Sequence, residues 1–293
     1  MHTIGFVGLG AMGAAMARQL VAKQFRVVGY DINEAAADAL AAAGGHKAGS
    51  VRQAANGADA LVVMVVNADQ AEQVLFGDGA VEALADGAPV IVCSTCAPDR
   101  AAAMAERCEV AGHPFIDAPV SGGVVGAEAG TLTIMAAAKK PDFAATEDLL
   151  RAMGSNLYHI GETAGQGSAM KTVNQLMAGV HIVVAAEAMA FAERAGIDPE
   201  LALEILSGSA ASSWMLKDRG ERMIGKSDAV TSAVDIFVKD LGIVLDAGRA
   251  MRMGLPLAAA AHQQYLDVSG AGDGKADDSQ VIRAYRKTKK TGA

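Results

Sequence analysis

The stretch that decides the fold is TIGFVGLGAMG, residues 3–13. Its first part, TIGFV, has the short apolar composition of a buried strand. Gly8, Gly10 and Gly13 follow directly in the spacing GxGxxG, and a helical pattern of small residues begins with them. In this context glycines permit a tight turn, a close approach of backbone to pyrophosphate, and close packing of helix on strand. The stretch therefore predicts the dinucleotide-binding loop of a Rossmann-type domain. The predicted cofactor-binding loop consists of Gly8, Leu9, Gly10, Ala11, Met12 and Gly13.

The second predicted strand, RVVGYD, ends in a carboxylate. Asp31 stands eighteen residues after Gly13, where a carboxylate accepts hydrogen bonds from the ribose hydroxyls of a dinucleotide. The alternative is an N-cap for the following helical segment, NEAAADAL. The carboxylate would repel a 2′-phosphate, and the next residues, 32–34, include no Lys or Arg to hold one. We therefore predict NAD as the cofactor in preference to NADP.

Short apolar runs alternate with helical patterns from residue 3 to about residue 160. The later strand candidates are ALVVMVV, PVIVCS, PFIDAP, TLTIMAA and NLYHI. Runs without polar alternation suit parallel strands covered on both faces, in βαβ units. After Gly165 no strand is predicted, and the first helix there is about thirty residues long. The sequence thus predicts an α/β Rossmann-type dinucleotide-binding domain over residues 1–164. An all-α domain over residues 165–293 follows, entered through a long interdomain helix.

Composition and charge exclude several classes of protein. Of 293 residues, 52% are hydrophobic and 20% charged, as in ordered globular proteins. The net charge is −8, and the only basic block is the short terminal segment RKTKKTGA, so nucleic acid is not an expected partner. The most apolar stretch contains His181 and Glu187, and no Lys or Arg precedes the apolar N-terminus. We therefore expect no membrane span and no signal peptide, and predict a cytoplasmic protein.

The three cysteines are too few for a disulfide framework. Cys93 and Cys96 have the CxxC spacing of a redox pair or half a metal site. No second CxxC and no His pair at ligand spacing accompany them. We predict two small residues at the end of a buried strand, and no metal site.

Polar residues follow three of the later strands. Asn67 comes after LVVMVV and Thr95 after PVIVCS. Because parallel strands present their carboxyl ends to the ligand crevice, both are candidate cofactor contacts, although each could be a turn residue. In DAPVSGG, Ser121, Gly122 and Gly123 offer a hydroxyl and backbone N–H groups that suit a carboxylate. A plain glycine-rich loop is the alternative.

A lysine lies in the apolar helical segment GSAMKTVNQLMAG, residues 167–179. Lys171, Asn174 and Gln175 stand at i, i+3 and i+4, so they share one helix face. Desolvation would bring the pKa of a lysine towards neutrality, which suits the acid/base that hydride transfer to or from an alcohol requires. Asn174 and Gln175 would then orient the substrate or the ammonium group. The alternative is a polar stripe on the solvent side of an amphipathic helix.

Four motifs together resemble the β-hydroxyacid dehydrogenase family: GFVGLGAMG, DAPVSGG, GQGSAMKTVNQ and FVKDLG, in this order within residues 3–286. The resemblance implies an NAD-dependent oxidoreductase acting on a small hydroxycarboxylic acid. It implies that Lys171 is the catalytic acid/base and that Lys239, in FVKDLG, reaches the cofactor from the helical domain. A solvated pair of Lys239 with Asp240 is the alternative. The resemblance also implies that Ser121, Gly122 and Gly123 bind the substrate carboxylate. It implies that the adenosine and pyrophosphate of the cofactor are bound by Gly8, Gly10, Gly13 and Asp31. Thr95 would lie nearer the nicotinamide end.

The substrate is the least determined part of this resemblance. Many family members have Asn where this chain has Gln175, but VNQ also occurs in the tartronate and threonate branches. The segments SSWMLKDRGERM, which contains Trp214, and KADDSQVIRAYR are most similar to the threonate branch. This implies a small polar C4 sugar acid, with 3-hydroxyisobutyrate and tartronate semialdehyde as the alternatives. Trp214 could instead be a core or interface anchor.

Two further expectations concern assembly and class. The helical half has more apolar surface than a lone bundle of its size needs, and family members commonly associate through it, so we expect a homodimer or homotetramer. The alternative from another class is a non-catalytic NAD-binding module. The presence of Lys171 and the acidic net charge disfavour that alternative.

Overall fold

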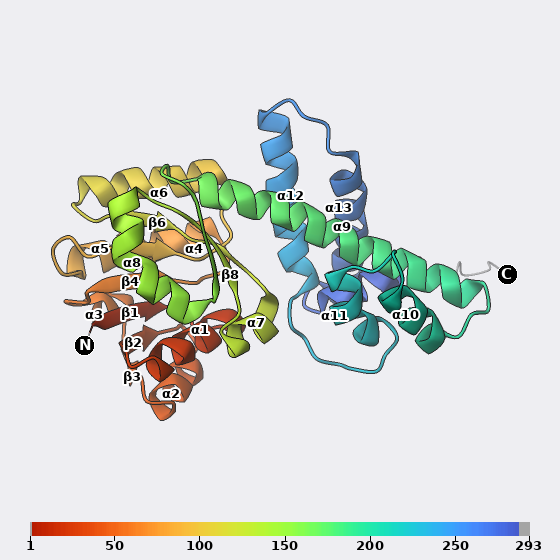
Figure 1. Cartoon of the computed structure of the whole chain (residues 1–293), viewed down its shortest axis with the longest axis horizontal. Helices are drawn as coiled ribbons and strands as arrows, with labels where there is room; N and C mark the ends of the chain where they lie inside the picture. The colour runs from red at the N-terminus through yellow and green to blue at the C-terminus, as the bar shows by residue number, and fades with distance from the viewer. Residues whose placement is uncertain (1, 287–293) are drawn as a thin grey trace. The chain divides into compact units, whose positions relative to one another are not determined.

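Within residues 2–286, which the computed structural model describes, nine strands form one sheet (Figure 1). The chain divides into two compact units, Met1–Lys171 and Thr172–Ala293. All nine strands belong to the first unit. They are β1 (Thr3–Val7), β2 (Arg26–Tyr30), β3 (His46–Lys47), β4 (Ala60–Val63), β5 (Val90–Val92), β6 (Phe115–Asp117), β7 (Val120–Ser121), β8 (Thr133–Ala137) and β9 (Asn156–Gly161).

The strand order places the glycine-rich loop at a topological switch point. The order is β3-β2-β1-β4-β5-β6-β8-β7, and β9 pairs with β8. β1 is parallel to β2 on one side and to β4 on the other, so the chain winds outward in both directions from β1. In sheets of this kind ligands bind outside the carboxyl ends of the strands at the switch point. The GxGxxG segment leaves β1 at this end.

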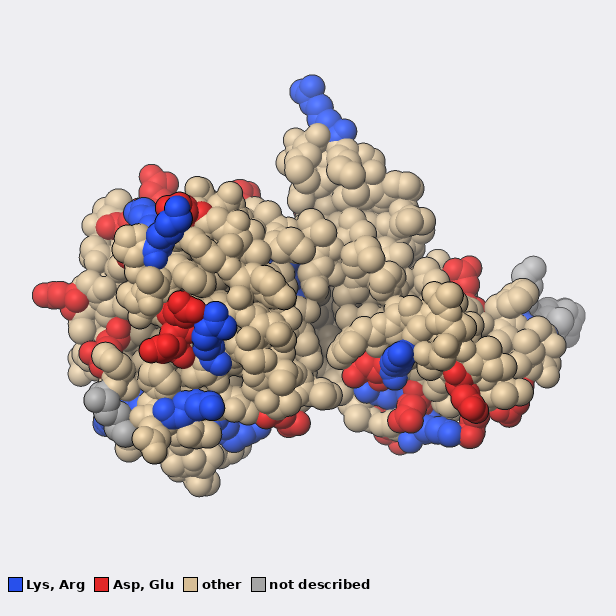
Figure 2. Space-filling view, in the orientation of Figure 1, with Lys and Arg blue, Asp and Glu red and all other residues tan. Residues whose placement is uncertain are grey.

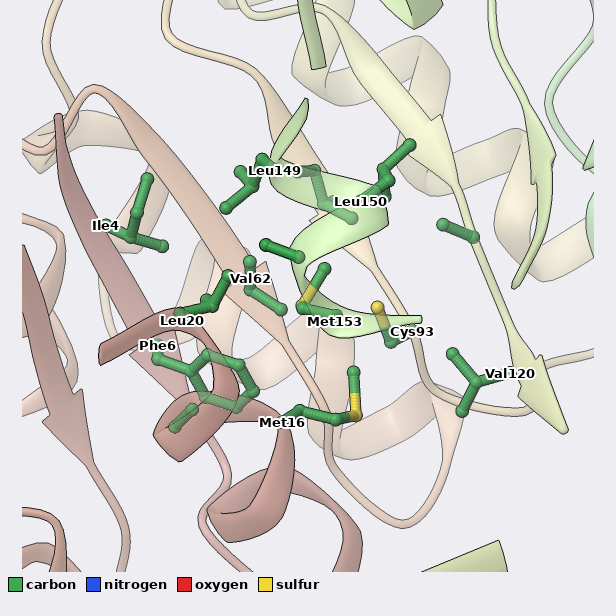
Figure 3. Packing of buried hydrophobic residues seen from close by; sticks show 14 of the residues in the cluster. Ile4, Phe6, Met16, Leu20, Val62, Cys93, Val120, Leu149, Leu150 and Met153 are labelled. Carbon is green, nitrogen blue, oxygen red and sulfur yellow. The ribbon is translucent and has the colours of Figure 1, made fainter. Parts of the chain in front are cut away.

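Helices cover both faces of the sheet. They are α1 (Ala11–Ala22), α2 (Glu34–Ala42), α3 (Val51–Ala55), α4 (Ala68–Glu72), the π-helical turn η1 (Gln73–Gly77), α5 (Ala80–Ala83), α6 (Pro98–Val110), α7 (Gly123–Ala129) and α8 (Lys140–Met153). Successive strand residues enter opposite cores: Phe6 packs with α1, α2 and α8, whereas Val7 packs with α3 to α6. Figure 3 shows side chains of β1, α1 and α8 in the first of these cores. Because both faces are buried, the strands read as continuous apolar runs.

The named elements of the second unit, within its described residues, are all helices or helical turns. Its first helix, α9 (Gln166–Arg194), begins in the first unit and has 29 residues. The remaining elements are α10 (Pro199–Gly208), α11 (Trp214–Met223), α12 (Val234–Ala250), α13 (Pro256–Val268), the π-helical turn η2 (Ser269–Asp273), the 3-10 turn η3 (Asp278–Ile282) and α14 (Arg283–Arg286). Phe237 of α12 stacks on Tyr265 of α13 in its core, with ring centroids 5.2 Å apart.

The seven predicted strands all form, and two short strands were not predicted. β3 and β7 have two residues each, too few to show a period, and both side chains of β3 are exposed. β8 departs from the parallel arrangement, because it runs antiparallel to β6 and β7. A parallel return needs a crossover of a dozen or more residues, whereas only the short α7 and its turns separate β7 from β8. The domain boundary near residue 164 stays a prediction; α9 starts at Gln166.

The expectation of no membrane span needs one correction. By length and composition α9 is apolar enough to cross a membrane, in spite of His181 and Glu187. However, 56% of its most apolar window is buried inside the protein, as in the core helix of a globular domain. The cytoplasmic location stays a prediction. The basic segment at 287–293 lies outside the described residues.

All three cysteines are buried. Although Cys93 and Cys96 are three residues apart, Cys93 packs in the core on one face of the sheet and Cys96 in the core on the other. Burial raises the pKa of the Cys93 thiol to about 12, a value that disfavours the reactive thiolate. This arrangement supports a packing role for the CxxC segment.

Charged side chains of both signs are mixed on the surface. Figure 2 shows Lys and Arg among Asp and Glu on the visible face of each unit. Mixed charge gives a weak long-range field, so recognition of a small anion depends on local groups.

Candidate active site

The glycine-rich loop has the backbone geometry that its sequence predicted. Gly8 has φ +95°, and a Cβ there would collide with the carbonyl oxygen of Met64. A Cβ at Gly13 would collide with the carbonyl oxygen of Gly8, so α1 can pack closely on the loop only with glycine. A Cβ at Gly10 would point into open space. Gly8 and Gly13 are thus required for the turn and the packing, and Gly10 leaves the outer side of the loop clear.

The loop also fits a dinucleotide electrostatically. Gly10 is the N-cap of α1 and contributes no side-chain hydrogen bond there. The first N–H groups of a helix have no partner within the helix and carry its positive dipole end, so they suit a pyrophosphate. The side chain of Leu9 is buried.

Asp31 is tied to this loop. Its Oδ2 accepts a hydrogen bond from the backbone N–H of Leu9 at 2.6 Å, and its Oδ1 accepts one from Asn33 N–H at 2.8 Å. The N-cap of α2 is Asn33, whose side chain accepts from Ala35 N–H. The N-cap alternative for Asp31 is therefore wrong. Each carboxylate oxygen can accept a further hydrogen bond, so the group is held in place with acceptor capacity for a ribose.

Asn67 and Thr95 lie where β4 and β5 end. Asn67 caps α4, since its Oδ1 accepts a hydrogen bond from Gln70 N–H at 2.9 Å. Next to Thr95, Ser94 Oγ accepts one from Val65 N–H at 3.0 Å and thereby joins the two strand ends. Asn67 thus caps a helix, and its cofactor contact, like that of Thr95, stays a prediction.

The SGG segment forms a turn between β7 and α7. Ser121 pairs with Thr133 of β8, and Gly122 and Gly123 follow with φ values of +128° and +62°. Two consecutive residues in this region favour glycine over any residue with a side chain. The half-buried Ser121 and the start of α7 are thus held on a rigid strand end. Their binding of a carboxylate stays a prediction.

Lys171 and Gln175 are both buried. Each is only 7% exposed, one turn apart on α9, while Asn174 is partly exposed. The interpretation of this face as a polar stripe on the solvent side is therefore wrong for Lys171 and Gln175. A buried lysine is costly unless it is paired or functional.

Gln175 belongs to a chain of polar side chains within the second unit. Its Oε1 accepts a hydrogen bond from Asn174 Nδ2 at 2.9 Å, and its Nε2 donates to Asp240 Oδ2 at 2.5 Å. Asp240 is 2% exposed, and its Oδ1 lies 2.8 Å from Lys239 Nζ. The alternative of a solvated Lys239–Asp240 pair is therefore wrong for Asp240. Lys239 keeps a partly exposed side chain that Asp240 holds in place.

Sequence reasoning missed Asp117, which is 1% exposed at the end of β6. Its Oδ2 accepts hydrogen bonds from Gly165 N–H and Ser168 N–H, both at 2.9 Å, and its Oδ1 accepts one from Ser168 Oγ at 2.7 Å. Burial raises the pKa of this carboxyl, against the opposing effect of the hydrogen bonds from Ser168 and Gly165. An aspartate that ends an otherwise apolar strand, in PFID, was the available signal.

The sheet topology and the glycine-rich loop define a dinucleotide-binding dehydrogenase. Residues 3–161 match the NAD binding domain of 6-phosphogluconate dehydrogenase, and residues 165–285 match the NAD-binding domain of NADP-dependent 3-hydroxyisobutyrate dehydrogenase. The chain belongs to the β-hydroxyacid dehydrogenase family, as its motifs predicted. It is an oxidoreductase of the type that acts on a CH–OH group with NAD(P).

The similar proteins cover almost the whole chain. L-threonate dehydrogenase from Cupriavidus necator is 42% identical over 97% of this chain and 96% of its own length. L-threonate dehydrogenase from Escherichia coli K12 is 41% identical over 96% and 94%. The crystal structure of 3-hydroxyisobutyrate dehydrogenase from Salmonella typhimurium matches with a TM-score of 0.92 and 42% identity, over 97% of this chain and 99% of that one. The predicted fold class is confirmed.

Proposed function

We propose that the protein oxidises L-threonate, or a closely related C4 sugar acid, with NAD as the hydride acceptor. The observation that carries the proposal is the 38–42% identity, over nearly the full chain, to L-threonate dehydrogenases of several bacteria. The threonate-like segments around Trp214 and near residue 280 support it. The second candidate substrate is 3-hydroxyisobutyrate, favoured by the structure from Salmonella typhimurium that carries that enzyme's name.

In this proposal the chain's own residues bind the acid and move its proton. Ser121 Oγ and the N–H groups at Gly122 and Gly123 hold the substrate carboxylate. Lys171, in its neutral form, takes the proton of the substrate hydroxyl during oxidation, and its ammonium form returns the proton during reduction. When bound, the nicotinamide accepts or supplies the hydride.

The other polar residues fix these groups. Gly8, Gly10, Gly13 and Asp31 hold the pyrophosphate and adenosine part of the cofactor, with Asn67 and Thr95 as further contacts. Asn174 and Gln175 orient the substrate, and Gln175 also joins Asn174 to Asp240. Lys239 has the cofactor contact that the family resemblance implies.

A spectrophotometric assay tests the substrate. The purified protein is supplied with NAD or NADP and with L-threonate, D-erythronate, 3-hydroxyisobutyrate or glycerate. The highest kcat/KM with L-threonate supports the proposal. Activity confined to 3-hydroxyisobutyrate would overturn the proposed substrate and leave the reaction type in place. Trp214 is half exposed and therefore not a core residue. That outcome would also show that Trp214 does not mark a threonate site.

Asp31 is expected to set the preference for NAD. Asp31→Asn keeps the size of the side chain and one acceptor, but it removes the charge that binds a ribose and repels a 2′-phosphate. A hydrogen bond to a charged group contributes about 1.5–3 kcal/mol, so kcat/KM for NAD should fall by about 10- to 100-fold. The NAD:NADP ratio should move towards NADP. Asp38→Asn removes an exposed carboxylate of α2 as the control; an equal ratio in all three proteins would refute the assignment.

We infer that the protein is a homo-oligomer formed through α9. Val173, Met177, Val184 and Phe191 are 50–74% exposed, and spacings of four and seven residues place them on one helix face. An exposed apolar stripe of this kind marks a contact surface. A second copy of the chain would bury it.

Phe191→Lys is expected to lower the oligomeric state, because it introduces a charge at the most exposed apolar position of the stripe. Size-exclusion chromatography with light scattering gives the mass of each variant. Val110→Lys, at an 86% exposed position on α6, is the control and should leave the mass unchanged. A wild-type mass of about 30 kDa, equal to that of one chain, would contradict the inference.

A further inference from the structure

The N-terminus of α9 lacks a cap of its own. The residue before the helix is Gly165, which has no side chain, and the first turn contains no acidic residue. The first N–H groups of a helix have no partner within the helix, and leaving them unpaired in a buried place is costly. Gly165, Gly167 and Ser168 are all buried. These donors therefore need an acceptor from elsewhere in the chain.

Asp117 supplies that acceptor from a distance of 48 to 51 residues in the sequence. Its carboxylate accepts hydrogen bonds from the N–H groups of Gly165 and Ser168 and from the Ser168 hydroxyl. A carboxylate at this position also complements the positive end of the helix dipole, and charge-assisted bonds of this kind are stronger than neutral ones.

Backbone contacts seat the same turn on the sheet. A Cβ at Gly167 would collide with the carbonyl oxygens of Met135, on β8, and of Asp117 itself. Gly165 has φ +95°, and a Cβ there would meet the carbonyl oxygen of Pro98 at 2.7 Å. The first turn of α9 thus lies directly on the end of β6 and on the middle of β8. The Asp117 carboxylate fixes the rotation of this turn about the helix axis, and the two glycines allow the turn to approach the sheet closely.

Lys171 stands one turn beyond this anchor. Ser168 precedes it by three residues, so the two lie on neighbouring turns of one helix face. Asp117, Ser168 and Lys171 all belong to the first compact unit. The direction in which Lys171 leaves the helix is therefore set by how the first turn is held.

From this geometry we propose that Asp117 is a positioning residue: it acts through Ser168 and the first turn of α9 to hold Lys171 in the geometry needed for proton transfer. The inference rests on the proposed function, in which Lys171 is the acid/base. A misplacement of about 1 Å at a reacting group can reduce the rate by about 10²-fold.

A double-mutant cycle on kcat tests the proposal in the full-length enzyme. Asp117→Asn keeps the shape and one acceptor oxygen but places an amide donor against backbone N–H donors. We expect kcat to fall by about 10- to 100-fold, with the Kd for NAD within about twofold of wild type. In a Lys171→Ala background the same change should lower kcat by less than about twofold, since the group it positions is gone. A fall of equal size in both backgrounds would show a merely structural role and overturn the proposal.

Two further variants keep the test decisive. Ser168→Ala removes the bond from Ser168 Oγ to Asp117 and leaves the backbone bonds to Asp117, so a smaller fall in kcat, about three- to tenfold, is expected. Asp59→Asn is the matched control. Asp59 also accepts a hydrogen bond from a backbone N–H, that of Thr3 at 2.7 Å, but Thr3 is at the amino end of β1, away from the carboxyl ends of the strands. This variant should leave kcat unchanged. If Lys171→Ala alone left kcat unchanged, the proposed function would fail. If Lys171→Ala were inactive but Asp117→Asn and Ser168→Ala were normal, only this inference would fail.

Discussion

Replacing Lys171 with alanine is expected to lower kcat by about 10²–10⁴-fold, the usual contribution of a positioned acid/base. Hydride transfer from an alcohol leaves a proton on the substrate oxygen, and in this protein a buried amine on α9 is the group proposed to take it. The Kd for NAD should stay near the wild-type value, because the glycine-rich loop and Asp31 do not depend on Lys171. Steady-state rates in both directions, together with NADH fluorescence titration, measure the two quantities.

Two control variants sharpen this prediction. Lys171→Arg keeps a positive charge but cannot lose its proton near neutral pH, so it should be as slow as Lys171→Ala in the oxidation direction. Lys217→Ala removes an exposed lysine of α11 and should be normal. Near-normal turnover of Lys171→Ala with NAD still bound would show that another group transfers the proton.

The parts of the fold that could be predicted are those with a local signal. The strands of the central sheet are buried on both faces, so TIGFV, ALVVMVV and PVIVCS show as apolar runs. The length of α9 follows from an unbroken helical pattern. Gly13 is required by a local collision, because a Cβ there would meet the carbonyl oxygen of Gly8, five residues earlier. In each case the residues that determine the structure are neighbours in the sequence.

The parts that could not be predicted depend on pairs far apart in the chain. Asp117 meets Ser168 across 51 residues, and Gln175 meets Asp240 across 65. Neither pair has a period or spacing that marks it, because each forms only after the sheet and the helices have packed.

A third long-range contact carries the second large prediction, in the helical unit. Arg219 of α11 donates to both oxygens of Asp278, from Nε at 2.8 Å and from Nη2 at 2.9 Å. Asp278 is fully buried and Arg219 is 6% exposed. Burial alone would lower the pKa of Arg219, but the hydrogen bonds and charges of Asp278 and Asp218 outweigh it and raise that pKa. Arg222 makes a neighbouring pair with Asp277 at 3.0 Å. These pairs join the two segments, around Trp214 and near residue 280, that most resemble the threonate branch.

Asp278→Asn should destabilise the helical unit by about 3–5 kcal/mol, because it leaves the Arg219 guanidinium buried without its main counter-charge. With a urea dependence of about 1–3 kcal/mol per molar, the unfolding midpoint should fall by one to several molar. The single tryptophan, Trp214, begins α11 and reports this unit directly. Asp246→Asn is the matched control, since the Arg249–Asp246 pair is 81% and 71% exposed and such pairs contribute about 0–1 kcal/mol.

The double variant Arg219→Met/Asp278→Leu separates the two effects of a buried pair. In Asp278→Asn the buried guanidinium keeps only Asp218 as a counter-charge. Removing both charges takes that guanidinium away, and Asp218 keeps Arg222 as a partner at 2.9 Å. Buried pairs replaced by apolar side chains of similar volume are often as stable as the original, so the double variant should recover most of the lost stability. If it stays as unstable as Asp278→Asn, the pair contributes net stability to the unit. If Asp278→Asn itself shifts the midpoint no more than Asp246→Asn does, the charges at Arg219 and Asp278 are not buried in solution as the structure places them.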